Sequence, residues 1–236
     1  MRGTGYFACW DNAGQVSCVV PGQSAKFQTA GTAPALAKGT VGWVLAHATS
    51  TGVVVQRLSS TGSAQGAPVP IIAGEKLTPT ITAAPPGFVV VAGAPMQVHR
   101  LDENLAVVGS VVDLGRDFWF NASVATAGTT VVVNVGVPYG SKVFVIEGNQ
   151  LARSFGMGGG GKTGLEVALL SDGTSIAGAW SDGEVKWSAA AAGQTVFAPL
   201  AQPGDTSGGP IALARIGSQL FAMNIREHAL QIVRLP

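Results

Sequence analysis

A short apolar run recurs five times along this chain at nearly constant spacing. The residues that open these runs, separated by 45, 43, 45 and 44 positions, are Trp43, Phe88, Val131, Ile176 and Leu220. Another apolar residue always stands seven positions earlier, at Leu36, Ile81, Val124, Leu169 and Leu213. Periods of roughly 40–50 residues containing several short strands are typical of β-propeller blades. The pattern therefore predicts an all-β chain made of repeated four-stranded sheets.

The unit at residues 34–72 divides most clearly into four strands. They read PALA, GWVLAH, VVVQRL and GAPVPII, and the prolines of the last strand suit the edge of a sheet. The same order recurs at 79–114, 123–155 and 166–200, and the unit at 210–235 has three strands. No run of ten residues has the 3.6-residue periodicity of an amphipathic helix, so we expect almost no helix.

The segment AKFQTA (25–30) reads as an outer strand with no complete unit before it. Joining it to the three C-terminal strands would close a single propeller of five blades, with both termini in one blade. Residues 1–22 would then form a separate hairpin and residues 23–236 the propeller. The hairpin itself resembles the second and third strands of a blade. An incomplete ring of six blades is therefore the alternative.

The two cysteines, Cys9 and Cys18, flank a turn-forming segment at residues 11–15. A hairpin centred on Ala13 and Gly14 would place them opposite each other, with Cα atoms about 4.5–5.5 Å apart, a distance that a disulfide can span. We expect a disulfide, which favours an oxidising compartment. Two buried free thiols are the alternative, and a metal pair lacks a third ligand nearby.

The repeat resembles that of secreted bacterial propellers of unassigned role. The resemblance is clearest in the segments 42–46 with 53–58 and 87–91 with 97–102. It implies the fold and export to the periplasm, the outer cell surface or the medium, and it carries over no catalytic residue. The first residues, MRGTGYFACW, contain no apolar h-region and no cleavage site, so we expect no signal peptide in this chain.

The amino-acid composition excludes several classes of binding partner. Charged residues make up 11% of the chain, against roughly 25% in soluble domains, and no basic run appears, so nucleic acid is not an expected partner. No apolar stretch approaches the roughly 18–20 residues of a spanning helix, so we expect no membrane span. Three histidines and scattered carboxylates offer no ligand spacing for a metal, and we expect no metal and no cofactor.

Residues 156–163, GMGGGGKT, match the phosphate-binding pattern G-x-x-x-x-G-K-T. A working phosphate loop needs a helix after it, so that backbone N–H groups and the helix end hold the phosphates. Here Gly164 and a predicted strand at 166–171 follow instead. We interpret the segment as a loop between blades and expect no nucleotide.

Residues 204–210, GDTSGGP, resemble the GDSGGP of trypsin-like proteases with an inserted Thr206. His47, Asp102 and Ser207 follow that family's order, but alternating strand directions would put Asp102 on the opposite face from the other two. The predicted inner strands carry Glu166 as their one carboxylate, whereas glycosidases need converging carboxylates. We therefore expect no enzyme, and a glycoside-active hydrolase ranks third among the functions considered.

Connections from outer to inner strand and from second to third strand share one face of a propeller, called here the loop face. Its polar and aromatic residues are Trp10, Asp11, His47, Asp117, Phe118, Trp119, Phe120, Tyr139, Trp180, Ser181, Asp182, Glu227 and His228. Our ligand-binding candidates among them are Asp117, Phe118, Trp119, Tyr139, Trp180, Asp182 and His47. Aromatic rings with neutral polar neighbours suit sugars, and they also suit a protein anchored through Trp and Tyr.

The sequence thus predicts an extracellular or cell-surface binding module, with carbohydrate ahead of a protein ligand. A structural or assembly role, with the propeller as a docking surface, is the alternative. Other interpretations of single residues stay open: Trp119 as a plug between blades and Trp180 as core. We interpret His99, which aligns with Gln56 and Val233, as an ordinary strand side chain and His228 as part of a solvated loop.

Overall fold

Strands are the regular elements of this chain wherever the computed structural model describes it. The described residues are 7–20, 22, 26–40, 42–74, 77–116, 122–137, 140–158, 167–171, 174–181, 185–191, 211–216, 219–226 and 229–235. They fall into two compact units, Met1–Arg116 and Asp117–Pro236. Within this part of the chain there is no helix long and apolar enough to cross a membrane.

The first unit contains three antiparallel sheets, in each of which strands consecutive in sequence are hydrogen-bonded neighbours. The first sheet consists of β1 (Ala8–Asn12), β2 (Gln15–Val19) and β3 (Lys26–Ala30). The second consists of β4 (Thr32–Gly39), β5 (Gly42–Ala48), β6 (Gly52–Leu58) and β7 (Ala64–Ala73). The third consists of β8 (Thr80–Ala84), β9 (Gly87–Ala92), β10 (Met96–Leu101) and β11 (Val107–Gly115). The two four-stranded sheets confirm the predicted plan of a blade.

The second unit repeats this plan. Its first sheet consists of β12 (Ala122–Ala127), β13 (Thr130–Val137), β14 (Gly140–Glu147) and β15 (Gln150–Gly158). Two further sheets consist of β16 (Val167–Ser171), β17 (Ser175–Ser181) and β18 (Val185–Ala191), and of β19 (Ile211–Ile216), β20 (Gln219–Arg226) and β21 (Ala229–Leu235). The fourth strand predicted at 195–200 lies outside the described residues.

The pairing register repeats with the sequence. In five sheets, the apolar residue seven positions before each repeat anchor pairs with the residue two positions after it. These pairs are Leu36 with Leu45, Ile81 with Val90, Val124 with Val133, Leu169 with Gly178, and Leu213 with Ala222. The constant offset noticed in the sequence is therefore the register between the first two strands of each sheet.

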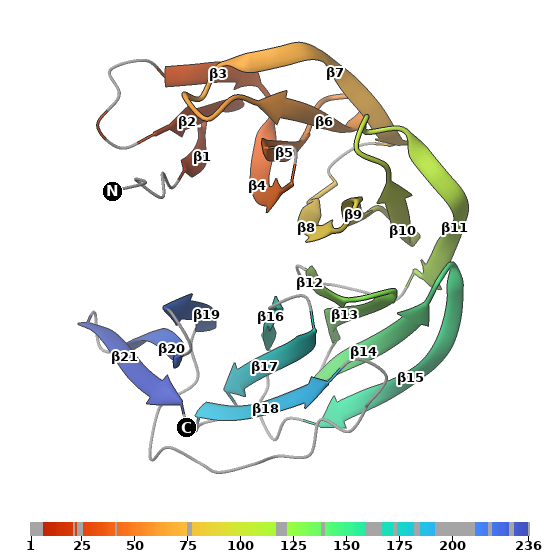
Figure 1. Ribbon diagram of the computed structural model, residues 1–236, viewed down its shortest axis with the longest axis vertical. Coiled ribbons are helices and arrows are strands. Elements are labelled where there is room, and N and C mark those ends of the chain that lie inside the picture. Colours follow the sequence, from red (N-terminus) through yellow and green to blue (C-terminus); the bar gives the residue numbers. More distant parts are fainter. Residues whose placement is uncertain are drawn as a thin grey trace. The chain divides into compact units, whose positions relative to one another are not determined.

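The first strands of successive sheets lie side by side within each unit. β4 contacts β8 in the first unit, and β16 contacts both β12 and β19 in the second (Figure 1). Later strands of each sheet lie farther from its first strand, with β7 and β11 at the sheet edges. This order confirms the predicted inner and outer strands.

Apolar side chains fill the space between neighbouring sheets. In the first unit, Val44 and Val53 of one sheet pack against Phe88 and Val90 of the next. In the second unit, buried residues of β12–β15 such as Val143 pack with Ile176 of β17 in the same way. Because burying one such side chain contributes about 1.5–3 kcal/mol, these layers hold successive sheets together.

The N-terminal hairpin and its disulfide are confirmed. Cys9 pairs with Cys18 across β1 and β2, their sulfurs are bonded, and their Cα atoms are 4.1 Å apart. Ala13 and Gly14 form the turn with φ values of 49° and 83°. Positive φ at both central residues is the type I′ geometry that matches the twist of a two-residue hairpin.

The expected partner of strand 26–30 differs in the structure. β3 pairs with β2 along its whole length, from Gln15 opposite Ala30 to Val19 opposite Lys26. The physical reason is a shared core: Phe27 packs against buried Val16 and Cys18, and these contact Leu45 and Leu58 of the next sheet. Phe7 adds a ring contact with Trp43, at 4.9 Å between centroids.

Candidate functional site

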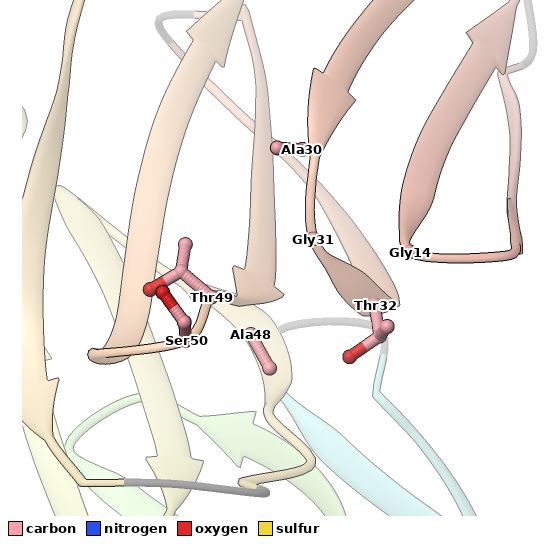
Figure 2. Close-up of a pocket in the computed structure, with 7 residues that line it drawn as sticks. All are labelled: Gly14, Ala30, Gly31, Thr32, Ala48, Thr49 and Ser50. Atoms are coloured by element: carbon pink, nitrogen blue, oxygen red, sulfur yellow. The ribbon is translucent and has the colours of Figure 1, made fainter.

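The loop face of the first unit carries an open pocket of about 560 Å³ (Figure 2). Three connections form it: the β1–β2 turn, the link from β3 to β4, and the β5–β6 turn. The lining residues are Gly14, Ala30, Gly31, Thr32, Ala48, Thr49 and Ser50. Outer-to-inner and second-to-third connections thus meet at one end of these sheets, as the sequence predicted.

Backbone hydrogen bonds fix the three connections. Gly31 N–H donates to the Gly14 carbonyl at 2.8 Å, which ties the β3–β4 link to the hairpin turn. The Asp11 carboxylate accepts a bond from Ala33 N–H at 2.7 Å, beside the positive φ of Ala33. Thr49 N–H donates to the Gly52 carbonyl at 2.7 Å. The pocket is therefore built on a constrained backbone, as a preformed binding site requires.

Hydroxyl and methyl groups make up the side chains of the wall, and none of the lining residues carries a charge. The Thr49 hydroxyl donates to the Gly52 carbonyl at 3.0 Å, and its oxygen accepts a bond from Thr51 N–H at 3.3 Å. The hydroxyls of Thr32 and Ser50 make no hydrogen bond to another described residue, so both are available. Figure 2 shows Thr49 and Ser50 on the β5–β6 turn, with Ala48 beside them.

His47, a predicted ligand contact, lies behind this wall. Only 1% of its surface is exposed, and neither ring nitrogen has a well-formed hydrogen bond to a described residue. Burial lowers the pKa of His47, and an interaction with the Ala48 backbone offsets this only in part. A Cβ at Gly31 would lie 2.5 Å from Nδ1, so the ring packs directly against Gly31. The β3–β4 link covers the ring in this structure, and a direct ligand contact of His47 stays a prediction.

Trp10 is the exposed aromatic of this part of the loop face, with 41% of its surface accessible. It pairs with Ser17, which in turn pairs with Gln28. The Gln28 amide donates to Gln15 Oε1 at 3.2 Å and to Ser17 Oγ at 3.3 Å. Trp10 is therefore in register with two neutral polar residues on the neighbouring strands, and a binding role for it stays a prediction.

Most other predicted loop-face residues fall outside the described part of the chain. These are Asp117, Phe118, Trp119, Phe120, Tyr139, Asp182, Glu227 and His228. Trp180 is on β17, where its backbone pairs with Val167 and Lys186, but its side chain is not described. Ser181 ends the same strand. The binding roles of these residues remain predictions.

His99 is an ordinary strand residue, as predicted. It pairs with Val90 on β9, the position that Gln56 occupies opposite Leu45. The side chain is buried, its Nε2 lies 3.2 Å from Gln97 Oε1, and burial lowers its pKa. Nothing in this arrangement points to a ligand.

The two motifs that suggested enzymes gain no support from the described residues. Asp102 Oδ1 accepts bonds from the N–H groups of Asn104 and Ala106, at 2.8 and 2.9 Å, so it stabilises the β10–β11 turn. Ser207 lies outside the described residues. Of the phosphate-loop pattern, residues 156–158 continue strand β15 against β14, and the remainder is not described.

The hydroxyl cluster of the pocket was not predicted. Its signal was present, because Thr49, Ser50 and Thr51 follow one another between two apolar strands. A run of small polar residues there is equally typical of a plain turn. Among the described residues, no three histidine, cysteine or acidic side chains gather as a metal site would require.

Comparison with known proteins identifies the fold. No family model and no curated protein matches this chain. The Dos1 propeller superposes with a TM-score of 0.60 at 12% identity, over 93% of this chain and 61% of its own. The dihydro-heme d1 dehydrogenase NirN, solved in complex with DHE, gives 0.59 at 14% identity, over 95% and 50%. The chain spans between half and two thirds of these proteins, and the likeness shows that it has a β-propeller fold.

Proposed function

We propose that this chain is a ligand-binding propeller that takes a neutral, hydroxyl-rich ligand, a carbohydrate, on its loop face. The observation that carries this proposal is the pocket formed by the turns around Gly14, Gly31 and Ser50. Sugars present C–H faces and hydroxyls, and this wall presents methyl groups and hydroxyls. Because the lining is uncharged, it offers phosphate or carboxylate ligands no ion pair.

Two further features support a glycan. Exposed Trp10, with its amide neighbours, supplies an aromatic surface on the same hairpin that contributes Gly14 to the pocket. The aromatic segment 117–120 and Tyr139, Trp180 and Asp182 are proposed to extend this surface. The Cys9–Cys18 disulfide suits an oxidising compartment, which agrees with export to the periplasm, the cell surface or the medium.

A protein-docking role is the second candidate, and the edge strand β11 favours it. Val107, Val108 and Val111 expose 44%, 41% and 42% of their surfaces on this strand. Among the described residues β11 is the last strand of its sheet, and an edge strand of this kind can pair with an added strand. We propose no catalytic activity, and a glycoside-active hydrolase remains the weakest candidate.

For the ring itself we propose six blades, the alternative named above, in place of five. The support is the pairing of β3 with β2, which makes β1–β3 a sheet of its own. With that sheet, the described residues form six sheets. An experimental structure in which β3 left β2 to extend the C-terminal sheet would restore the five-bladed count.

A glycan array tests the proposed ligand, with three proteins compared at one concentration. The double variant Thr32→Ala/Ser50→Ala removes two available hydroxyls, and Ser63→Ala removes one from the β6–β7 turn at the other end of the sheet. Each hydrogen bond contributes about 0.5–1.5 kcal/mol. We therefore expect the double variant to bind roughly tenfold more weakly and Ser63→Ala to bind like the wild type.

Two results would count against the pocket. Sugar hits that the double variant retains would place the ligand elsewhere on the protein. An array without hits, together with one protein that copurifies from the native cell envelope, would favour docking.

A further inference from the structure

The pocket and the buried ring of His47 share one wall. Gly31 lines the pocket on one side and packs against His47 on the other. A Cβ built on Gly31 would lie 2.5 Å from His47 Nδ1 and 2.5 Å from the Ala48 carbonyl oxygen. Movement of the ring in that direction must therefore move the β3–β4 link, and with it the pocket.

The site of His47 suits a neutral imidazole and does not suit a charged one. Both ring nitrogens lack a well-formed partner among the described residues, and the side chain is 1% exposed. A protonated ring carries two N–H donors and a positive charge, and it needs acceptors for both donors. The Ala48 backbone offsets the cost of burying that charge only in part, so protonation favours any rearrangement that provides two good acceptors.

The charged groups on the surrounding strands do not compensate this cost. Neighbouring β4 carries Lys38 and β6 carries Arg57, both at the other end of their strands, and Lys26 is at the far end of β3. β8 carries no titratable residue. Asp11 is on β1, which contacts β4, and its carboxylate is already bonded to Ala33 N–H at the start of β4, two residues after Gly31. Recruiting Asp11 to the ring would remove that bond from the start of β4.

We propose that His47 is a proton-sensitive latch for this pocket. When the ring takes up a proton, the β3–β4 link moves away from it, the bond between Gly31 N–H and the Gly14 carbonyl weakens, and the pocket changes shape. A ligand held at neutral pH is then released in acid. The release of a ligand depends on the proposed function above, whereas the movement of the link does not.

The direction of the pH dependence follows from burial. Desolvation lowers the pKa of His47 below its ordinary 6.5, so the latch is closed at neutral pH. It opens only when the pH falls clearly below that value. The β3–β4 link opens while the rest of the protein stays folded, because local opening of a link requires less free energy than global unfolding.

Amide hydrogen exchange of the ligand-free protein, followed residue by residue by NMR at about pH 7.5 and about pH 5, tests the latch. After correction for the intrinsic effect of pH, we expect a selective loss of protection at the Gly31 amide in acid. His47→Gln should abolish this loss, because the amide cannot take up the proton. The matched control is His99→Gln, which removes the other buried, lowered-pKa histidine and should leave the loss at Gly31 unchanged.

Several outcomes would overturn the proposal. Equal protection of Gly31 at both pH values, or a loss that persists in His47→Gln, excludes the latch. If His47→Gln does not fold, the imidazole of the wild type can be titrated by its carbon-bound proton signals. A midpoint for His47 that differs from the midpoint for Gly31 exchange then excludes the latch. All these results are independent of the glycan array, so the latch and the proposed ligand can fail separately.

Discussion

The ring of Phe88 on β9 lies over the Cα of Gly39 on β4, in the neighbouring sheet. A Cβ on Gly39 would be 2.6 Å from the nearest ring carbon and 2.9 Å from the next. Phe88 is 1% exposed and belongs to the core between the two sheets, so it has little room to retreat. The absence of a side chain at Gly39 therefore sets how closely these two sheets approach.

We expect Gly39→Ala to lower the free energy of unfolding by about 1–3 kcal/mol, the usual cost of overpacking a filled core. Urea denaturation monitored by tryptophan fluorescence measures it. Gly156→Ala is the control, because a Cβ there meets no atom within 4 Å. Equal stability of the two variants would show that the sheets can move apart without cost.

The Cys9–Cys18 disulfide closes a loop with a sequence separation of 9. Replacing both cysteines by alanine should lower the free energy of unfolding by about 2–3 kcal/mol in the chain-entropy model. Intact mass after alkylation without reductant checks the bond itself. Two alkylated thiols would contradict the disulfide, whereas an unmodified mass would agree with it.

Val16 tests whether the N-terminal sheet is part of the core. It is fully buried against Leu45 and Leu58 of the next sheet, so Val16→Ala should cost about 1–3 kcal/mol of stability. Val107→Ala, at an exposed strand position, should change stability by less than about 0.5 kcal/mol. An unchanged melting temperature for Val16→Ala would mean that the hairpin is an independent addition.

The two buried histidines predict acid sensitivity. Burial lowers the pKa of both His47 and His99 below 6.5, so the unfolded chain binds their protons more readily than the folded chain does. The contribution of these two histidines to the free energy of unfolding should be constant above about pH 7. The free energy of unfolding should fall as the pH drops below 6.5. Urea midpoints between about pH 8 and about pH 5 measure this, and His99→Gln should flatten the decline. A midpoint that rises in acid would contradict the assignment.

Trp119 separates a binding role from a packing role. If it contacts the ligand, Trp119→Ala should weaken binding by roughly 1–3 kcal/mol and leave the melting temperature nearly unchanged. If it fills a space between blades, the same change should cost about 3–5 kcal/mol of stability. Thermal denaturation of this variant distinguishes the two, and a large loss would move the search to Tyr139 and Trp180.

The fold was predictable because it depends on positions that repeat. The seven-residue offset of Leu36 and Trp43 recurs in five of the six described sheets, and strand pairing follows from it. The site was less predictable, because His47 has a neighbour that sequence spacing does not reveal. Gly31 covers it only because β3 pairs with β2, and that pairing depends on Phe27 meeting the core beside Cys18.

The shared register has a consequence for how such a chain can change over generations. In five of the six described sheets, one third-strand position pairs with the same second-strand position, yet its side chain differs from sheet to sheet. The occupants and their partners are Gln56 with Leu45, His99 with Val90, Phe144 with Val133, Ser188 with Gly178, and Val233 with Ala222. An amide, an imidazole, a phenyl ring, a hydroxyl and an isopropyl group are all accommodated within one frame. Each repeat can therefore acquire new chemistry by a single codon change while its neighbours keep their alignment.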